Sequence, residues 1–504
     1  MAQVVYLCTS IKHMISTTEN PVSQQNYERQ LGDWIEQEKA AIELIHITGS
    51  LWFNKSVELI IFRNQLVDRS ASQILNLHQY AKDIVKRPIG IQETLEIAHA
   101  LTTFDLAPSR IDIGKLTAEW IQERQSFGND VNGFISNKLA DFIGHDRRKM
   151  VPRDVVLYGF GRIGRILARE LVAQAGKGEQ LRLRAIVVRK RSADDLSKRA
   201  ELLRNDSVHG PFPGTVIEDH DKNALIVNGH TIYVIDAKNP DEVDYASFGI
   251  NNALLIDNTG ASRDRDGLSL HLKASGIDKV LLTAPGKGDI PNVVYGVNER
   301  SHNEDEKVYS AASCTTNAIV PVLAVIESKL GIERGHIETI HSYTNDQNLL
   351  DNYHSKYRRG RSAAMNMVIT ETGADKAVSK VIPALEGKLT GNAVRVPTPD
   401  VSLAILNLTV KQEITKDSVN ELLKDAALNG RLVEQIQYSY SNELVSSDLI
   451  GNPCASIVDS PATIVSKDKK SMILYVWYDN EYGYSRQVVR FAKYLANVIR
   501  LTYY

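Results

Sequence analysis

Cysteine is scarce in this sequence of 504 residues, where only Cys8, Cys314 and Cys454 are present. An odd number of widely separated cysteines is typical of a reducing compartment, and none of the three has metal-ligand spacing. Long hydrophobic runs are also missing, since no stretch approaches the roughly 18 apolar residues that a membrane span needs. The N-terminal residues lack the basic flank and long apolar core of a secretory signal. We therefore expect a cytoplasmic protein with no membrane segment and no bound metal.

An excess of charge of either sign is lacking as well. The chain has 59 lysine and arginine residues against 61 aspartate and glutamate residues, for a net charge of -2. No global field therefore favours nucleic acid or an anionic membrane as a partner. The length allows two or three domains, since about 100 to 200 residues per domain is usual.

A glycine-rich turn follows the apolar strand predicted at Val155–Leu157, and a helical pattern follows the turn. Gly159 permits a tight turn, Gly161 allows the backbone to approach a pyrophosphate, and Gly164 allows the helix to pack close to the strand. The pattern alone is weak evidence, but further strands are predicted downstream. They lie at 183–188, 232–235, 253–256 and 279–283. Together these features predict a doubly wound, Rossmann-type α/β domain that binds a dinucleotide.

A thiol and an imidazole form the second candidate site. Cys314 precedes the apolar run 318–326, so a helix is expected to begin just after it and to offer unpaired N–H groups to a thiolate or an oxyanion. His341 ends the strand-like segment 337–340. A lone cysteine or histidine is usually a core residue. Their combination with a dinucleotide motif favours a nucleophile and its base.

From about Val155 to its C-terminal end the chain resembles phosphorylating glyceraldehyde-3-phosphate dehydrogenase. The matching motifs keep the order of that family and nearly its spacing. They are GFGRIGR (159–165), DSVHG (206–210), NTG (258–260), TAPGKG (283–288), SCTTN (313–317), HSYTNDQ (341–347), GKLTGNAVRVPTPDVS (387–402) and WYDNEYGYS (477–485).

The resemblance implies a Rossmann-type dinucleotide-binding domain at 151–312, completed by a C-terminal helix within 480–504. It also implies an α+β catalytic domain with a mostly antiparallel sheet at 313–479. The implied activity is the reversible oxidation of glyceraldehyde 3-phosphate with inorganic phosphate to 1,3-bisphosphoglycerate, a step of glycolysis and gluconeogenesis. Members of the family are commonly homotetramers, so we expect a homo-oligomer.

The resemblance also implies roles for individual residues. Cys314 would form the thiohemiacetal and thioester, and His341 would act as acid and base. Two anion pockets would hold the substrate phosphate and the attacking phosphate, with Thr344 and Arg395 in the first and Ser313, Thr315, Arg361, Thr372 and Gly373 around the second. The implied cofactor contacts are Gly159, Gly161, Arg162, Ile163, Gly164, Lys238, Thr259, Thr283 and, near the nicotinamide amide, Asn480.

One departure from the family concerns the cofactor. NAD-preferring members carry an acidic residue after the second strand, where it binds the adenosine ribose. An alignment through DSVHG places Arg191 there, next to Arg189 and Lys190. These cations could neutralise a 2′-phosphate, and Asn352-Tyr353 replaces the Leu-Pro usual in NAD-preferring members. We expect NADP to be favoured, with NAD possible if the segment is an ordinary basic turn.

The first 150 residues lie outside the resemblance. Apolar stripes at helical spacing predict an all-α domain, interrupted near 49–50, 87–90 and 107–109 and ending at about 145–150. Three tryptophans in this segment argue for a folded domain. Its partner is not evident from the sequence.

Two alternatives stay open. Erythrose 4-phosphate is a rival substrate for the same chemistry. A nucleotide-sensing regulatory or scaffold protein that acts through its N-terminal domain is a rival class. The presence of Cys314, His341, Arg361 and Arg395 together favours the enzyme, because a scaffold need not keep a nucleophile, a base and both anion sites.

Overall fold

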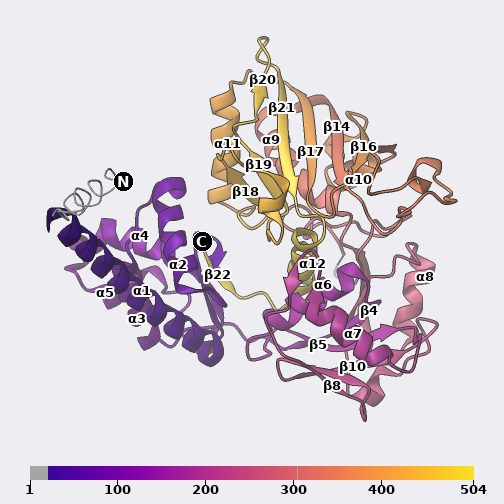
Figure 1. Ribbon diagram of the computed structural model, residues 1–504, viewed down its shortest axis with the longest axis horizontal. Coiled ribbons are helices and arrows are strands. Elements are labelled where there is room, and N and C mark those ends of the chain that lie inside the picture. Colours follow the sequence, from indigo (N-terminus) through magenta and orange to yellow (C-terminus); the bar gives the residue numbers. More distant parts are fainter. Residues whose placement is uncertain (1–20, 304) are drawn as a thin grey trace, which may run out of the picture. The chain divides into compact units, whose positions relative to one another are not determined.

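The computed structural model describes residues 21–303 and 305–504 and divides the chain into two compact units. The first unit consists of the described residues up to Arg147 together with Leu501–Tyr504, and the second spans Arg148–Arg500. Figure 1 shows their elements.

The N-terminal unit contains helices and a four-stranded sheet, so the predicted all-α domain is wrong. Its strands β1 (Val57–Ile61), β2 (Asn64–Gln65), β3 (Ser109–Asp112) and β22 (Leu501–Tyr503) pair in the order β2-β1-β3-β22. All five residues of β1 are buried. A short apolar run of this kind reads equally well as a helix segment by periodicity alone. The helices are α1 (Pro21–Lys55), α2 (Ala71–Tyr80), α3 (Ile91–Thr103), α4 (Ile113–Glu123) and α5 (Val131–Lys138).

The break expected near residue 49 is also absent, because α1 continues through it to Lys55. Leu44, Ile47 and Leu51 recur at helical spacing and are all buried. Tertiary packing of this face therefore overrides the low helix propensity of glycine.

The last strand corrects the predicted extent of the nucleotide-binding domain. Residues 501–504 were assigned to that domain with the C-terminal helix, yet β22 is a parallel neighbour of β3, with Leu501 opposite Ser109 and Tyr503 opposite Ile111. Figure 1 shows this yellow strand among the indigo elements of the N-terminal unit. The reason is a strand pairing between residues almost 400 positions apart, which local patterns do not encode.

The nucleotide-binding half of the second unit is a doubly wound sheet, as predicted. Its strand order is β13-β12-β11-β4-β5-β10-β9-β8, parallel from β13 to β10 and antiparallel beyond it. Helix α12 packs on α6, so the chain returns to this domain after the catalytic domain. The bounds are β4 (Arg153–Tyr158), α6 (Arg162–Ala173), β5 (Leu181–Val188), α7 (Asp195–Arg204), β8 (Val216–Asp219), β9 (Ala224–Val227), β10 (His230–Asp236), β11 (Ala253–Asp257), α8 (Arg265–Ser269), β12 (Ile277–Leu282), β13 (Val308–Ser310) and α12 (Tyr482–Leu495).

The catalytic half is a mostly antiparallel sheet of order β15-β16-β14-β17-β21-β19-β18. Side chains of β17 and β21 alternate in burial, as expected when one face of a sheet is covered. Helix α9 supplies much of that cover, and most of its residues are buried. The bounds are α9 (Cys314–Leu330), β14 (Ile332–Ser342), β15 (Val368–Thr370), α10 (Ala374–Val381), β16 (Leu389–Val396), β17 (Ser402–Val410), α11 (Lys416–Leu428), β18 (Ile436–Ser439), β19 (Ser456–Asp459) and β21 (Ser471–Tyr478).

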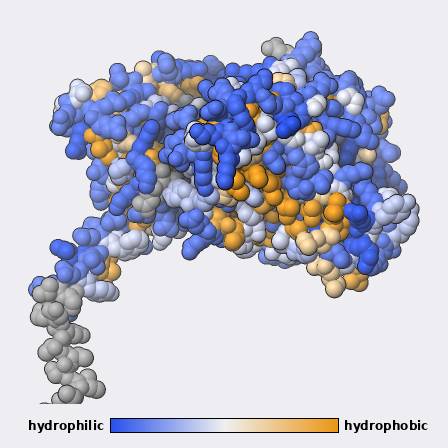
Figure 2. Space-filling model, turned by 90° about the horizontal axis from the view of Figure 1, so that it is seen from above, coloured by the Kyte–Doolittle hydropathy of each residue, from blue (hydrophilic) through white to orange (hydrophobic). Residues whose placement is uncertain are grey.

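The face seen in Figure 2 is largely hydrophilic, with apolar side chains gathered in limited areas. Among the described helices, none has the length and apolar character that crossing a bilayer requires.

Candidate active site

Cys314 is the first residue of α9, where the sequence predicted a helix to begin. Ser313 caps the helix, and its hydroxyl accepts a hydrogen bond of 3.0 Å from the Thr316 N–H. Ala312 has a left-handed φ of 55°, and its carbonyl accepts a 3.0 Å hydrogen bond from the Tyr484 hydroxyl. The backbone thus turns sharply and presents the thiol at the positive end of the helix dipole.

His341 lies at the end of β14 and faces the thiol. Its Nε2 is 3.5 Å from Cys314 Sγ, and its Nδ1 is 2.8 Å from the Ser342 carbonyl oxygen. Burial, together with the nearby Arg395 cation, lowers the pKa of His341 to about 3. Burial also raises the pKa of the Cys314 thiol, although Arg395 opposes this. Both shifts favour the uncharged forms, a thiol beside a neutral imidazole.

Arg395 reaches this pair from β16, where it is the parallel partner of His341 in the sheet. Its guanidinium Nη1 lies 2.8 Å from His341 Nδ1 and 2.8 Å from the Ser342 carbonyl oxygen. An arginine can only donate, and a ring that accepts a proton at Nε2 must carry its own proton on Nδ1. In the His341 tautomer whose Nε2 can act as a base, the Nδ1–H group and Arg395 therefore both donate to the Ser342 carbonyl oxygen.

Tyr478 completes the site, and the sequence analysis gave it no role. Its buried hydroxyl is 3.0 Å from Thr315 Oγ1 and 2.8 Å from Thr339 Oγ1, and its ring stands edge-on to His341 at 6.0 Å. Burial raises the pKa of this phenol well above its usual range. Strand alternation in β21 could have placed it on the buried face, but only the fold shows what it contacts.

Two of the predicted anion-binding residues lie in different environments, since Thr344 contacts an ion pair whose arginine is mostly buried, whereas Arg361 is exposed. Thr344 donates to Asp346, and Arg359 pairs with the same carboxylate. Arg359 is mostly buried and also contributes to the low pKa of His341, although it was not predicted as a site residue. Arg361, which was predicted, is exposed and donates from Nε to Asp351 at 2.7 Å. Thr372 and Gly373 stand at the start of α10, where Gly373 is the N-cap.

The glycine turn fits a dinucleotide. Gly159 has a φ of 97°, which favours glycine, and a Cβ added at Gly164 would lie 2.5 Å from the Gly159 carbonyl oxygen. Gly161 is the N-cap of α6, has no side-chain cap, and borders open space. The first N–H groups of α6 are thus available to a pyrophosphate, as the motif predicted. Ile163 packs against the core of the sheet.

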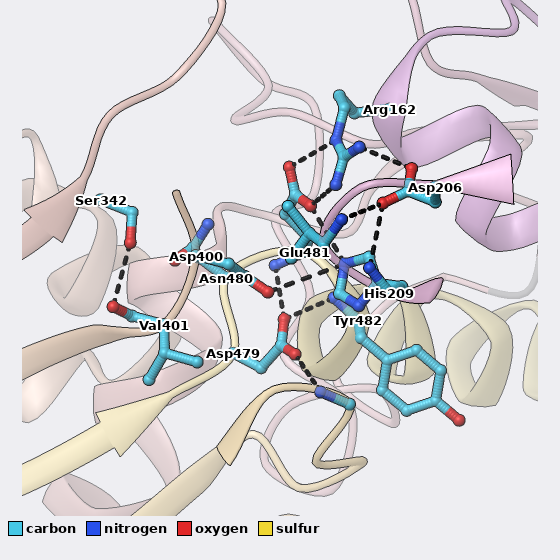
Figure 3. Close-up of polar contacts among 12 residues, drawn as sticks. Arg162, Asp206, His209, Ser342, Asp400, Val401, Asp479, Asn480, Glu481 and Tyr482 are labelled. Atoms are coloured by element: carbon cyan, nitrogen blue, oxygen red, sulfur yellow. Dashed lines mark hydrogen bonds and ion pairs between the residues drawn. The ribbon is translucent and has the colours of Figure 1, made fainter. Parts of the chain in front are cut away.

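The side chain of Arg162 is engaged within the protein, so a cofactor contact of this residue would have to be made by its backbone. The guanidinium is held between Asp206 and Glu481, which raise its pKa against the effect of burial. Figure 3 shows this ion pair beside Asn480. Asn480 Oδ1 accepts a 2.7 Å hydrogen bond from the Ser402 hydroxyl, which leaves its amide nitrogen as the donor for a ligand.

Thr259 and Thr283 flank the carboxyl end of β11. The hydroxyl of Thr259 donates to Asp257 Oδ1 at 2.7 Å, and that of Thr283 donates to the Asp257 carbonyl oxygen at 3.1 Å. Lys238 follows β10, and its backbone N–H is 3.0 Å from Glu242 Oε2. These residues lie at the carboxyl end of the parallel strands, where ligands bind in such sheets.

The basic segment 189–191 follows β5 and is exposed. Asp195, which could have replaced the missing ribose acid, is held by Arg199 at 2.5 Å and accepts the Arg191 N–H. Asp236 accepts the Lys190 N–H at 2.8 Å. Both nearby carboxylates are therefore engaged with the protein, while the three cationic residues are exposed and the Arg189 guanidinium donates to the Lys238 carbonyl at 3.2 Å.

Comparison with known proteins decides the family. Residues 153–265 match the model of the glyceraldehyde 3-phosphate dehydrogenase NAD binding domain, and residues 313–480 match that of the C-terminal domain. The chain belongs to the glyceraldehyde-3-phosphate dehydrogenase family. The resemblance read from the motifs is thereby confirmed, and membership supports an oxidoreductase that uses a nicotinamide dinucleotide.

Relatives differ in how much of the chain they share. A "Glyceraldehyde-3-phosphate dehydrogenase-like protein" of Pseudomonas aeruginosa (strain UCBPP-PA14) is 49% identical over 460 residues, covering 90% of this chain and 98% of its own. The glyceraldehyde-3-phosphate dehydrogenase of Zymomonas mobilis is 40% identical over 68% of this chain and 99% of its own. The chloroplastic form A from Zea mays is 42% identical over 68% of this chain and 82% of its own. The first match must extend into the N-terminal unit, so that unit is shared with part of the family.

Proposed function

We propose that the protein is a phosphorylating glyceraldehyde-3-phosphate dehydrogenase that prefers NADP to NAD. The observation that carries this proposal is the thiol of Cys314 at the N-terminus of α9, 3.5 Å from His341 Nε2. The basic segment 189–191 supports the choice of cofactor.

The proposed reaction begins when Cys314 Sγ attacks the aldehyde carbon and His341 Nε2 takes the thiol proton. His341 then gives this proton to the former carbonyl oxygen, so the product is a thiohemiacetal whose hydroxyl would lie near the first N–H groups of α9 and the ring is again neutral. When bound, the nicotinamide accepts the hydride that leaves the substrate carbon. His341 takes the hydroxyl proton as the thioester forms.

Inorganic phosphate then attacks the thioester carbon, which breaks the C–S bond and releases an acyl phosphate. Two phosphate groups must therefore lie near Cys314. Arg395 is partly buried beside His341, and it would bind the substrate phosphate together with Thr344. The residues proposed around the attacking phosphate are Ser313, Thr315, Arg361, Thr372 and Gly373.

The cofactor preference follows from charge. A 2′-phosphate carries up to two negative charges, which the exposed side chains of Arg189, Lys190 and Arg191 can neutralise. The acids that would bind a ribose hydroxyl instead are occupied, Asp195 by Arg199 and Asp236 by the Lys190 backbone.

A homo-oligomer is proposed as well, with a tetramer suggested by the family resemblance. Residues 349–369 of the catalytic domain expose several large apolar side chains. Leu349 and Leu350 are 74% and 73% exposed, and Tyr353 is 89% exposed. Such side chains on one segment are typical of a surface that a second subunit covers. Sedimentation equilibrium of the wild-type chain and of Leu349→Ser should show a shift toward smaller species in the variant.

Initial-rate kinetics test the reaction. Glyceraldehyde 3-phosphate should be oxidised only in the presence of inorganic phosphate or arsenate, and Cys314→Ser should abolish turnover. The same assay with erythrose 4-phosphate tests the rival substrate. No turnover with either aldehyde, despite tight dinucleotide binding, would overturn the proposal and favour a nucleotide-sensing scaffold.

The cofactor preference has its own test. Arg191→Asp should raise KM for NADP by about 10- to 100-fold, the loss expected for a hydrogen-bonded charge pair, and should lower KM for NAD. Lys273→Asp is the control, because Lys273 is an exposed lysine of the same domain, outside the segment 189–191. A wild-type preference for NAD would refute the argument from Arg191 and leave the enzyme assignment intact.

A further inference from the structure

Three side chains with metal-binding chemistry meet where the two domains of the second unit join. They are His209 from the DSVHG turn, Asp400 just before β17 and Asp479 just after β21 (Figure 3). One potential ligand atom from each lies within 4.8 Å of the others. The residues are far apart in the sequence, which explains why local spacing indicated no metal site.

Asp400 is the unusual member of this group. The residue is only 3% exposed, and in the described part of the chain neither of its carboxylate oxygens has a hydrogen-bond partner. Its Oδ2 lies 3.6 Å from His209 Nε2. Burying an ionised carboxylate without a partner costs free energy. A cation or a proton is therefore expected next to this side chain.

Three backbone N–H groups donate hydrogen bonds to the carboxylate of Asp479. Its Oδ1 accepts from the N–H groups of Glu481 and Tyr482 at 2.9 and 2.6 Å, and its Oδ2 accepts from Gly451 N–H at 2.8 Å. The backbone therefore holds this carboxylate, and one of its oxygens lies within 4.8 Å of the candidate ligand atoms of Asp400 and His209.

The charges around the group do not balance without a further cation. Arg162 and Arg165 lie against Asp206, and Arg162 also pairs with Glu481. These two arginines offset those two acids, and the imidazole of His209 is shared, since its Nε2 lies 3.1 Å from Glu481 Oε2 as well as 3.6 Å from Asp400 Oδ2. Burial, with the neighbouring charges of Asp479 and Glu481, raises the pKa of Asp400 to about 9.

We propose that His209, Asp400 and Asp479 bind a divalent transition-metal ion of the Zn²⁺ type. One imidazole and two carboxylates are a common donor set for Zn²⁺, and a fourth position would be left for water. At metal-ligand distances of about 2.1 Å, ligand atoms stand roughly 3 to 4 Å apart. The 3.6 Å between His209 Nε2 and Asp400 Oδ2 fits this range. The Asp479 oxygen lies within 4.8 Å of both atoms and would have to move closer to join them.

The ion would connect three segments that surround Asn480. Asp479 precedes Asn480 directly, and Ser402, two residues after Asp400, donates to Asn480 Oδ1 at 2.7 Å. The ion would thereby tie the nucleotide-binding loop at His209 to the segment that carries the proposed nicotinamide contact. Its role would be structural, since it lies outside the Cys314–His341 pair.

The test is metal binding by the full-length chain in a Cys314→Ser background, because the thiol and His341 could themselves take up Zn²⁺. The protein is treated with chelator and titrated with Zn²⁺ by calorimetry, while proton release is followed in weak buffer. Asp400→Asn and His209→Gln remove one ligand each. Asp266→Asn removes an exposed carboxylate of α8 and serves as the matched control.

We expect the parent to bind one Zn²⁺ per chain at this site and to release protons on binding. In Asp400→Asn and in His209→Gln the affinity for this ion should fall by at least about tenfold. Asp266→Asn should bind as the parent does. Equal Zn²⁺ binding by the parent and Asp400→Asn would overturn the proposal, as would the absence of binding. In that case Asp400 holds only a proton, and Asp400→Asn should raise the melting temperature without metal. Because the experiment measures metal uptake, a negative result would overturn the metal site and leave the proposed dehydrogenase activity unaffected.

Discussion

Removal of residues 501–504 should destabilise the N-terminal unit selectively. These residues supply β22, the edge strand beside β3, although they follow the whole enzyme core in sequence. A stop codon after Arg500 removes the strand without touching the Cys314 site. The N-terminal unit would then present β3 as an open edge.

The size of the effect can be worked from the contacts of β22. Leu501 N–H donates to the Pro108 carbonyl at 3.2 Å, the Tyr503 hydroxyl donates to Glu119 at 2.6 Å, and Arg110 donates to the Tyr504 hydroxyl at 2.9 Å. Lys115 and Arg63 also lie over the rings of Tyr503 and Tyr504, at 4.5 and 4.8 Å. At about 0.5 to 1.5 kcal/mol per hydrogen bond and 0.5 to 1 kcal/mol per cation–π contact, the loss is about 3 to 6 kcal/mol. That is a large share of the roughly 5 to 15 kcal/mol that stabilise a typical domain.

Tryptophan fluorescence during urea unfolding can follow the two units separately. Trp52 and Trp120 are buried in the N-terminal unit, whereas Trp477 lies in β21 of the enzyme core. The truncated chain should lose an early fluorescence transition while its dehydrogenase activity without urea is kept. Tyr503→Phe is the matched control, since it removes one hydrogen bond, costs about 1 kcal/mol and keeps the strand. An unchanged first transition in the truncated chain would refute the reasoning.

Three further outcomes are expected. Gly164→Ala should abolish dinucleotide binding in calorimetry while the chain stays folded, because its Cβ would meet the Gly159 carbonyl oxygen at 2.5 Å; unaltered affinity would contradict the role of the turn. Although burial opposes it, hydrogen bonds from the backbone of His209 and Val208 lower the pKa of Asp206 to about 2. Since that value lies below the unfolded one, the carboxylate stabilises the fold above about pH 4 and loses its effect as the pH falls toward 2. Asp206→Asn should therefore cost about 2 kcal/mol at pH 7 and much less at pH 2 in urea titrations, and an equal cost at both values would be inconsistent with this linkage. Tyr478→Phe leaves two buried threonine hydroxyls without their partner and should lower stability by about 1 to 3 kcal/mol, whereas a neutral effect in thermal unfolding would show that water replaces the phenol.

The enzyme core was predictable because its signals are local. The turn at Gly159–Gly164 needs glycine for steric reasons that the motif itself expresses. The helix that begins at Cys314 was predicted from a polar cap followed by an apolar run, and Ser313 is indeed its cap. In the N-terminal unit the same reasoning failed at β1, since five buried residues, four of them apolar, do not show whether they form a strand or a helix.

The sequence by itself determined the family and the dinucleotide turn, and it predicted Cys314 and His341 as nucleophile and base, because each depends on residues that are neighbours in the chain or on motifs in a given order. The tertiary structure alone decided which distant side chains share a buried environment. It brought Arg395 beside His341 through strand pairing, and it added β22 to the N-terminal sheet. It also gathered His209, Asp400 and Asp479 around one buried position. Pairing and desolvation act between residues hundreds of positions apart, and no local pattern of the chain records them.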